Sequence, residues 1–327
     1  MRTDAKIGVI GATGAVGAVT MRLLAARGHE HVRAFASGRS AGRTLDGGIV
    51  VEEASPEALA AAGLDLALFS VGTSASRELV PHAVDGGALV VDKSSAYRLV
   101  DGYPLVVPEV NGARALEAIE TTRVVANPNC CTIPLTCVLK PLHDAAGLRR
   151  VRVSTYQSVS GAGAQRMEQL RNEPPEEHNL VMDWSWEGDE TDEESKLRAE
   201  TRKILELPDL PLSATTVRVP VLVGHAESVW IETEEPLTPE QASQLLAAAP
   251  SVRVVEVPAV PTPRDAAQTD DVLVGRIRPD RAAERNGLAL FLACDNLNKG
   301  AALNAIQIAE LMLSAREPTV PEQVRHA

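Results

Sequence analysis

The stretch AKIGVIGATGAVG, residues 5–17, decides the fold of the first half of the chain. Its opening apolar run predicts a strand, and residues 15–27 place Val16, Leu23 and Leu24 on one face of a predicted helix. Glycines in the loop between them let the backbone approach a pyrophosphate closely, and the helix N-terminus adds N–H donors. We predict a dinucleotide site here, against the alternative of a tight turn without a ligand, formed by Gly11, Ala12, Thr13, Gly14, Ala15 and Val16.

The rest of the first half continues the alternation of strand and helix. Short apolar runs at residues 32–37, 64–72, 87–95 and 122–128 predict strands, with a helix over residues 74–87. Continuous apolar strands that alternate with helices indicate a parallel sheet buried on both faces. We therefore expect an α/β fold in which residues 1–127 form a Rossmann-type domain.

The second half has a different pattern. Its predicted strands are longer and partly alternate polar and apolar residues, which suits a mixed or antiparallel sheet with helices on one side. We expect an α+β domain over residues 128–297, with an acidic surface excursion at residues 173–196 that leads into a helix near residues 194–207. The amphipathic C-terminal helix, residues 298–315, is expected to complete the first domain, and residues 316–327 to be a frayed tail.

Composition and charge exclude several classes of protein. The 327 residues carry a net charge of −12, which argues against a nucleic acid or an anionic membrane as the main partner. No apolar run approaches the roughly 20 residues that span a bilayer, and the N-terminus lacks the pattern of a signal peptide. A cytoplasmic location follows, in which the four cysteines are expected to be thiols. Neither the cysteines nor the histidines show metal-ligand spacing, so no metal is expected.

The end of the second predicted strand bears on the choice of nicotinamide cofactor. NAD sites usually place a carboxylate there for the ribose hydroxyls, whereas an arginine accommodates the 2′-phosphate of NADP. Residues 36–43 contain no carboxylate, and Arg39 is flanked by the hydroxyls of Ser37 and Ser40. We predict NADP, against the alternative of a solvated basic turn.

Two residues are candidates for covalent chemistry. Cys130 stands in NPNCCTIP, residues 127–134, between a predicted strand and a predicted helix. A helix N-terminus lowers the pKa of a thiol and its N–H groups can hold an oxyanion, although a buried structural cysteine is an equal alternative on spacing alone. His225 lies in a turn between two predicted strands, where a lone histidine is more often structural.

Taken together, seven motifs in order resemble the aspartate-semialdehyde dehydrogenase family over essentially the whole chain. They are GATGAVG (11–17), SSAYR (94–98), NPNCCTIP (127–134), TYQSVSGAG (155–163), EESKLRAETRKIL (193–205), RVPVLVGH (218–225) and DNLNKGAALNA (295–305). The resemblance implies an NADP-binding Rossmann domain, a catalytic and dimerisation domain, and a homodimer or tetramer. It also implies reduction of L-aspartyl-4-phosphate to L-aspartate 4-semialdehyde with release of inorganic phosphate, in the biosynthesis of lysine, threonine, methionine and diaminopimelate.

The same resemblance assigns roles to individual residues. Cys130 is the expected nucleophile that becomes a thioester, Gln157 the group that orients the substrate, and His225 the acid/base. The remaining assignments are Arg98 and Lys196 for the phosphate, Glu193 for the substrate amino group, Arg218 for the α-carboxylate, Ser160 and Gly161 beside the nicotinamide, and Asn296 on NADP. Without the family, Arg98, Glu193 and Lys196 would each be read as solvated surface charges.

Three departures from the family pattern and two rival functions remain. Cys131 replaces the usual Ser or Thr, Asn298 replaces the commoner Arg, and the chain is short between Gln169 and Glu193. N-acetyl-γ-glutamyl-phosphate reductase shares the fold and the Cys/His chemistry but takes a longer, acetylated substrate. The other rival is a catalytically silent dimeric paralogue, against which the retained Cys130, Gln157, Arg218 and His225 argue.

Overall fold

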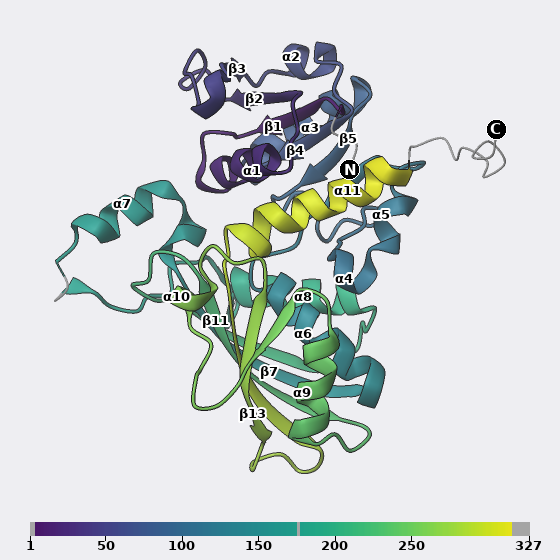
Figure 1. The fold of residues 1–327 in the computed structure, drawn as a ribbon, viewed down its shortest axis with the longest axis vertical. Helices are drawn as coiled ribbons and strands as arrows, with labels where there is room; N and C mark the ends of the chain where they lie inside the picture. Colours follow the sequence, from purple (N-terminus) through teal and green to yellow (C-terminus); the bar gives the residue numbers. More distant parts are fainter. Residues whose placement is uncertain (1–3, 175–176, 316–327) are drawn as a thin grey trace.

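The computed structural model describes residues 4–174 and 177–315, so the expected tail at residues 316–327 lies outside the described residues. The first domain is built on a parallel sheet of order β3-β2-β1-β4-β5-β6 (Figure 1). This is the strand order of a dinucleotide-binding fold, and it confirms the Rossmann-type prediction. The strands are β1 (Ile7–Ile10), β2 (Val32–Ala36), β3 (Val51–Glu53), β4 (Leu66–Phe69), β5 (Leu89–Asp92) and β6 (Val124–Ala126).

Helices cover both faces of this sheet, as its apolar strands require. Apolar residues of α1 (Ala15–Ala26) and α11 (Asn304–Ala315) share one core with Val9 and Leu68. Residues of α2 (Pro56–Ala61) and α3 (Thr73–Asp85) pack on the opposite face. Figure 1 shows α11 running along the side of this sheet that faces the second domain. The C-terminal segment therefore returns to the first domain, and it begins with a π-helical stretch, Asn298–Leu303.

The second domain contains a mixed sheet of order β10-β7-β11-β14-β13-β12. Its two outer pairs are parallel and its three inner pairs antiparallel, which confirms the predicted α+β class. One face packs against three helices, α6 (Thr132–Ala146), α8 (Asp192–Leu205) and α9 (Pro239–Ala248). The strands are β7 (Leu148–Gln157), β10 (Leu212–Arg218), β11 (His225–Thr233), β12 (Val252–Val255), β13 (Val272–Pro279) and β14 (Gly287–Cys294).

The remaining elements are short. They are α4 (Pro108–Asn111), α5 (Ala113–Glu117), α7 (Ala164–Asn172), α10 (Pro263–Ala266), the strand pair β8 (Trp186–Glu187) and β9 (Glu190–Thr191), and the 3₁₀ turns Asp46–Gly48 and Val159–Ala162. No helix in the described part of the chain is long and apolar enough to cross a membrane. The proposed domain boundary between residues 127 and 128 stays a prediction.

The topology brings the ends of four strands together at one end of the second sheet. Parallel β7 and β10 end side by side, with Gln157 paired to Arg218. Antiparallel β11 begins at that end with His225, whose register partner Cys294 ends β14. The loop after β6, at the carboxyl edge of the first sheet, carries Cys130 to the start of α6. Candidate residues from both domains therefore meet between the two sheets.

Candidate active site

A cavity of about 300 Å³ lies where the two domains meet. It runs from the glycine loop of the first domain to the strand ends of the second. Of the residues predicted from the sequence, it is lined by Val16, Arg98, Cys130, Gln157, Ser160, Gly161, Glu193, Arg218 and Asn296. Lys93, Trp184 and Asn129 also line it. A single cavity thus joins the predicted cofactor loop to the predicted nucleophile.

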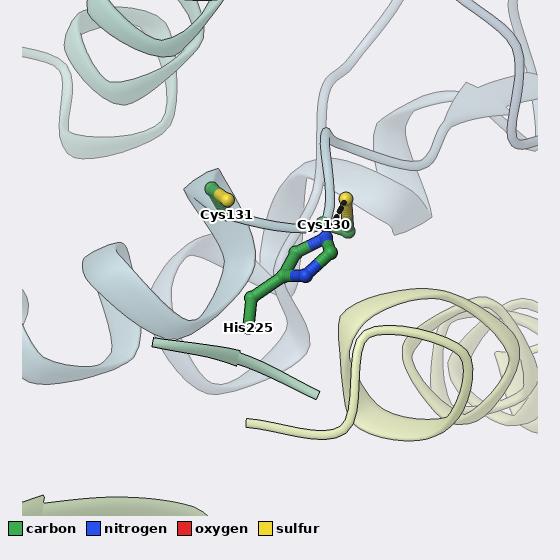
Figure 2. A group of neighbouring side chains, drawn as sticks. All are labelled: Cys130, Cys131 and His225. Atoms are coloured by element: carbon green, nitrogen blue, oxygen red, sulfur yellow. Dashed lines mark hydrogen bonds between the residues drawn. The ribbon is translucent and has the colours of Figure 1, made fainter. Parts of the chain in front are cut away.

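Cys130 and His225 form a contacting pair at the cavity wall: Cys130 lines the cavity, whereas His225 is buried and contacts the thiol without lining the cavity itself. The Cys130 Sγ lies 3.2 Å from His225 Nε2, and Figure 2 shows this contact with Cys131 beside it at the start of α6. The other ring nitrogen, Nδ1, accepts a 3.0 Å hydrogen bond from the Ser158 backbone N–H. A nitrogen that accepts carries no proton in the neutral ring, so the neutral His225 holds its proton on Nε2, directed at the sulfur.

The two neighbouring thiols have opposite environments. The pKa of Cys130 lies well below its usual value, because the Cys131 side chain hydrogen-bonds to it and because His225 and Arg98 add favourable charge, against the effect of burial. Burial raises the pKa of Cys131 well above its usual value, and its side chain is fully buried. Cys130 is thus the more acidic of the two thiols and the one that lines the cavity.

The turn that carries His225 is fixed by a glycine and an asparagine. Gly224 has φ +95°, and a Cβ there would lie 2.6 Å from the Pro263 carbonyl oxygen, so no other residue fits without a shift. Its N–H donates to Asn296 Oδ1 at 2.9 Å. The same oxygen accepts from the Ser158 hydroxyl at 3.0 Å and from the Ser160 hydroxyl at 3.1 Å. Asn296 therefore ties the His225 turn to the loop after β7.

Glu193 accepts hydrogen bonds from two side-chain amides of the cavity wall. Its Oε1 accepts from Asn129 Nδ2 at 2.9 Å and from Gln157 Nε2 at 3.0 Å. Helix α8 begins at Asp192, two residues before the expected start, because Thr191 and Glu194 form a reciprocal capping box. This start places Glu193 in the first turn, on the cavity wall. Burial raises the pKa of Glu193, and the charge of Cys130 adds to the effect.

Arg218 lies deep in the cavity with its guanidinium fully engaged. Its Nη1 donates to the Ser158 carbonyl at 3.1 Å, and its Nε and Nη2 each lie 3.2 Å from Asp183 Oδ1. The Trp184 ring stacks on the guanidinium, with 4.4 Å between Cζ and the ring centroid. Asp183 and Trp184 belong to the acidic excursion, and nothing in the sequence pattern assigned them to the site.

The two residues predicted for the phosphate are placed differently. Arg98 lines the cavity, but its guanidinium donates to Glu200, to the Asn127 carbonyl and to the Lys93 carbonyl. Lys196 does not line the cavity in the part of the chain that the structure describes, and its Nζ lies 2.6 Å from Asp192 Oδ2. Glu200, which the sequence analysis missed, also accepts the Asn129 N–H at 2.7 Å. The Arg98–Glu200 pair therefore holds the loop that carries the nucleophile.

The glycine loop is packed closely where the fold needs it and open where a ligand would lie. A Cβ on Gly17 would lie 2.0 Å from the Gly11 carbonyl oxygen, whereas a Cβ on Gly14 would make only an ordinary contact. Lys93 follows β5 and lines the cavity, as Val16 does, and among the described residues its Nζ has Thr20 Oγ1 as its one hydrogen-bond partner, at 3.4 Å. Burial lowers the pKa of Lys93 to about 7. Loop and cation together fit the pyrophosphate of a dinucleotide.

The predicted 2′-phosphate site lies in the turn after β2. Ser37 and Arg39 are exposed and Ser40 is half-buried. A carboxylate that the sequence argument missed lies beside them, since a Cβ on Gly38 would be 2.7 Å from Glu53 Oε1. Glu53 ends β3, a three-residue strand that was not predicted. The turn therefore combines the expected cation with an acidic neighbour.

One cluster could ligate a metal. Cys130, Cys131 and His225 place their ligand atoms within 4.8 Å of one another. Two of these three are the candidate nucleophile and its acid/base partner. We therefore treat the cluster as catalytic.

Comparison with known proteins places the chain among semialdehyde dehydrogenases. Residues 6–118 match the family described as semialdehyde dehydrogenase, NAD binding domain, and residues 139–299 match semialdehyde dehydrogenase, dimerisation domain. An aspartate-semialdehyde dehydrogenase of Corynebacterium glutamicum is 44% identical over 94% of this chain and 99% of its own.

Two solved structures are also similar. Aspartate semialdehyde dehydrogenase II of Vibrio cholerae, complexed with ASA, has a TM-score of 0.89 at 36% identity, over 96% of this chain and 99% of its own. An aspartate semialdehyde dehydrogenase of Candida albicans, solved with NADP, has a TM-score of 0.75 at 27% identity, over 95% of this chain and 99% of its own.

Proposed function

The chain belongs to the aspartate-semialdehyde dehydrogenase family, and from that premise we propose that Cys130 carries the NADP-dependent reduction of L-aspartyl-4-phosphate to L-aspartate 4-semialdehyde. The observation that carries the proposal is the 3.2 Å contact between Sγ of Cys130, which lines the interdomain cavity, and Nε2 of the buried His225. A low-pKa thiol beside an imidazole, next to a dinucleotide loop, is suited to acyl transfer followed by reduction.

The first step forms a thioester. The Cys130 thiolate attacks the acyl carbon of aspartyl phosphate, a C–S bond forms, the C–O bond to phosphate breaks, and inorganic phosphate leaves with that electron pair. The positive end of the α6 dipole adjoins Cys130 and would stabilise the acyl oxygen as it gains charge, which lowers the barrier to this attack. Arg98 lines the cavity and offsets the charge of the leaving phosphate.

The second step reduces the thioester to the aldehyde. NADPH, when bound, supplies the hydride that the acyl carbon accepts. His225 Nε2–H donates a hydrogen bond to the oxyanion that results, and this oxyanion becomes the aldehyde carbonyl as the C–S bond breaks and its electron pair restores the Cys130 thiolate. In the reverse direction the same residues would act on the aldehyde, with bound NADP accepting the hydride and inorganic phosphate releasing the acyl group from Cys130.

Substrate recognition is assigned to three side chains that line the cavity. Arg218 binds the α-carboxylate through its planar guanidinium, and Glu193 meets the amino group. Gln157, held by Glu193 at 3.0 Å, orients the acyl group beside the thiol. A Glu193 carboxylate on the cavity wall suits a free amino group, which favours the four-carbon substrate over the longer, acetylated one of the rival reductase.

The cofactor site combines residues of the first domain with the loop after β7. The N-terminus of α1 and the Lys93 ammonium bind the pyrophosphate, because no carboxylate lies within ion-pair distance of Lys93 Nζ among the described residues. Ser160, Gly161 and Asn296 border the nicotinamide half. Arg39, with Ser37 and Ser40, binds the 2′-phosphate and makes NADP the preferred cofactor.

A homodimer is supported by the match to a dimerisation domain at residues 139–299. The face of the second sheet opposite α6, α8 and α9 carries the partly exposed rings of Tyr156, Trp230 and Phe291. This face is the surface proposed to pair in the dimer, with a tetramer as the next level of assembly. A nucleophile that must stay reduced suits the cytoplasm.

Steady-state turnover tests the proposed function. The purified protein is expected to reduce NADP in the presence of L-aspartate 4-semialdehyde, and only when inorganic phosphate is added. N-acetylglutamate semialdehyde is the matched control, which is expected to be turned over poorly. Faster turnover of the acetylated substrate would assign the chain to the rival reductase. If neither substrate were turned over, the chain would be the catalytically silent paralogue.

A further inference from the structure

We propose that Asp183 and Trp184 complete the substrate-carboxylate subsite. Asp183 occupies the Arg218 guanidinium in the free protein and is displaced by the α-carboxylate of the substrate, while Trp184 stays as the wall on which the guanidinium rests. The inference rests on the proposed function of Arg218 as the carboxylate clamp.

The backbone fixes this segment to the strand end that carries Arg218. The Val181 N–H donates to the Arg218 carbonyl at 2.9 Å, and the Arg218 N–H donates to the Val181 carbonyl at 2.8 Å. These reciprocal hydrogen bonds form an isolated antiparallel bridge, two residues before Asp183. Asp183 and Trp184 are therefore held against Arg218 by the main chain, independently of their side chains.

Asp183 is placed as a substitute for the substrate carboxylate. Its Oδ1 lies 3.2 Å from both Nε and Nη2 of Arg218, and its Oδ2 lies 3.4 Å from Nε. A carboxylate that meets two guanidinium nitrogens is the contact expected of a bound α-carboxylate. Among the described residues this guanidinium makes one other hydrogen bond, from Nη1 to the Ser158 carbonyl, which an exchange at Nε and Nη2 leaves in place.

The difference in exposure indicates which partner moves. The Arg218 side chain is 6% exposed and the Asp183 side chain is 34% exposed. A buried guanidinium without a counter-ion is costly, so Arg218 keeps an anion at all times. The Asp183 carboxylate has access to water and can be solvated when another anion takes its place. Asp183 does not line the cavity, whereas Trp184 and Arg218 do.

Trp184 gives the clamp its orientation. Its ring lies 4.4 Å from Arg218 Cζ, a cation–π contact in a partly desolvated site. The ring fixes the plane of the guanidinium and therefore the direction from which a carboxylate can approach it. The subsite thus selects for a carboxylate strong enough to replace Asp183, and it presents that carboxylate in one orientation.

Replacement of Asp183 tests the exchange. Asp183→Asn should lower the KM for L-aspartate 4-semialdehyde about three- to five-fold, the range of a partly exposed ion pair, with kcat and the KM for phosphate unchanged. Asp189→Asn is the matched control, because Asp189 lies in the same excursion, is exposed, and has no contact with the site. An unchanged or higher KM in Asp183→Asn, or the same fall in both variants, would overturn the proposal.

A chemical readout separates this proposal from the proposed function. Phenylglyoxal modification of Arg218, followed by peptide mass spectrometry, should be faster in Asp183→Asn than in the wild type and unchanged in Asp189→Asn. This readout needs no turnover, so an inactive wild type would refute the function and still test the exchange. Trp184→Leu should raise the KM for the semialdehyde, whereas Trp184→Phe should have a KM close to that of the wild type. Equal kinetics in both Trp184 variants and the wild type would remove Trp184 from the subsite.

Discussion

Glu200 is the residue whose replacement should most clearly separate the packing of the site from its chemistry. Its carboxylate is fully buried and accepts two hydrogen bonds, one from Arg98 Nη1 at 3.0 Å and one from the Asn129 N–H at 2.7 Å. Glu200→Gln keeps the size of the side chain but removes the charge. Its amide oxygen can satisfy one of the two donors, and its NH₂ group faces the other.

The expected cost follows from these contacts. Removal of one partner from a buried ion pair destabilises a protein by about 3–5 kcal/mol, because the other charge stays buried without compensation. Arg98 keeps its hydrogen bonds to two backbone carbonyls, and the Gln oxygen keeps one donor satisfied. Glu200→Gln should therefore lower the free energy of unfolding by about 3 kcal/mol, toward the lower end of that range. It should also lower kcat, since the loop that carries Cys130 loses its anchor.

Urea unfolding followed by tryptophan fluorescence and by circular dichroism measures the loss. Glu206→Gln is the matched control, because Glu206 forms an ion pair with Arg114 at the surface. The Glu206 side chain is 55% exposed and the Arg114 side chain is 47% exposed. Such a pair contributes at most about 1 kcal/mol, so the control should be nearly neutral. A Glu200→Gln protein as stable as the control would refute the structural role of this pair.

The remaining predictions concern the cofactor and the substrate clamp. Arg39→Ala should raise the KM for NADP far more than the KM for NAD, and equal effects on both would remove Arg39 from the 2′-phosphate site. Because the pKa of Lys93 is lowered to about 7 by burial, the free enzyme loses this charge as the pH rises above 7. The phosphates of NADP favour the ammonium form of Lys93, so NADP binding above pH 7 should be coupled to proton uptake and should weaken as the pH rises. Calorimetry in buffers of different ionisation enthalpy should detect this proton uptake in the wild type and not in Lys93→Met. Arg218→Lys keeps the charge but loses the planar guanidinium, and steady-state kinetics should show a severe loss of kcat/KM for the semialdehyde, whereas near wild-type kinetics would show that bidentate geometry is unnecessary.

Much of the fold could be predicted because its signals are local. The apolar strands and the glycine loop of the first domain carry their own periodicity, and the return of the C-terminal helix follows from its apolar face. Strand β3 was missed because Val51–Glu53 contains a single buried residue and two carboxylates. The start of α8 was placed too late because its capping box spans Thr191 and Glu194, inside a stretch that its charge had marked as surface.

Residues of the site could be predicted only where they lie in a motif that the family resemblance associates with a role. Cys130 and His225 are 95 positions apart, and nothing in their spacing predicts the contact that the sheet register creates. Glu200 and Asp183 lie in charged segments where solvation is the ordinary expectation, so their contacts with arginines became visible only in three dimensions. Lys196 forms an ion pair with Asp192, and its assignment to the phosphate, which rests on the resemblance alone, stays a prediction.

The central claim is that Cys130, and not Cys131, carries the acyl group. Semialdehyde and NADP without phosphate should let the thioester accumulate, and fragmentation of the peptide that contains both cysteines should place the added mass on Cys130. Cys130→Ser should lose turnover by about 10³-fold or more and form no adduct, whereas Cys131→Ser should keep most of its activity. An acyl group on Cys131, or full turnover without any adduct, would contradict the account.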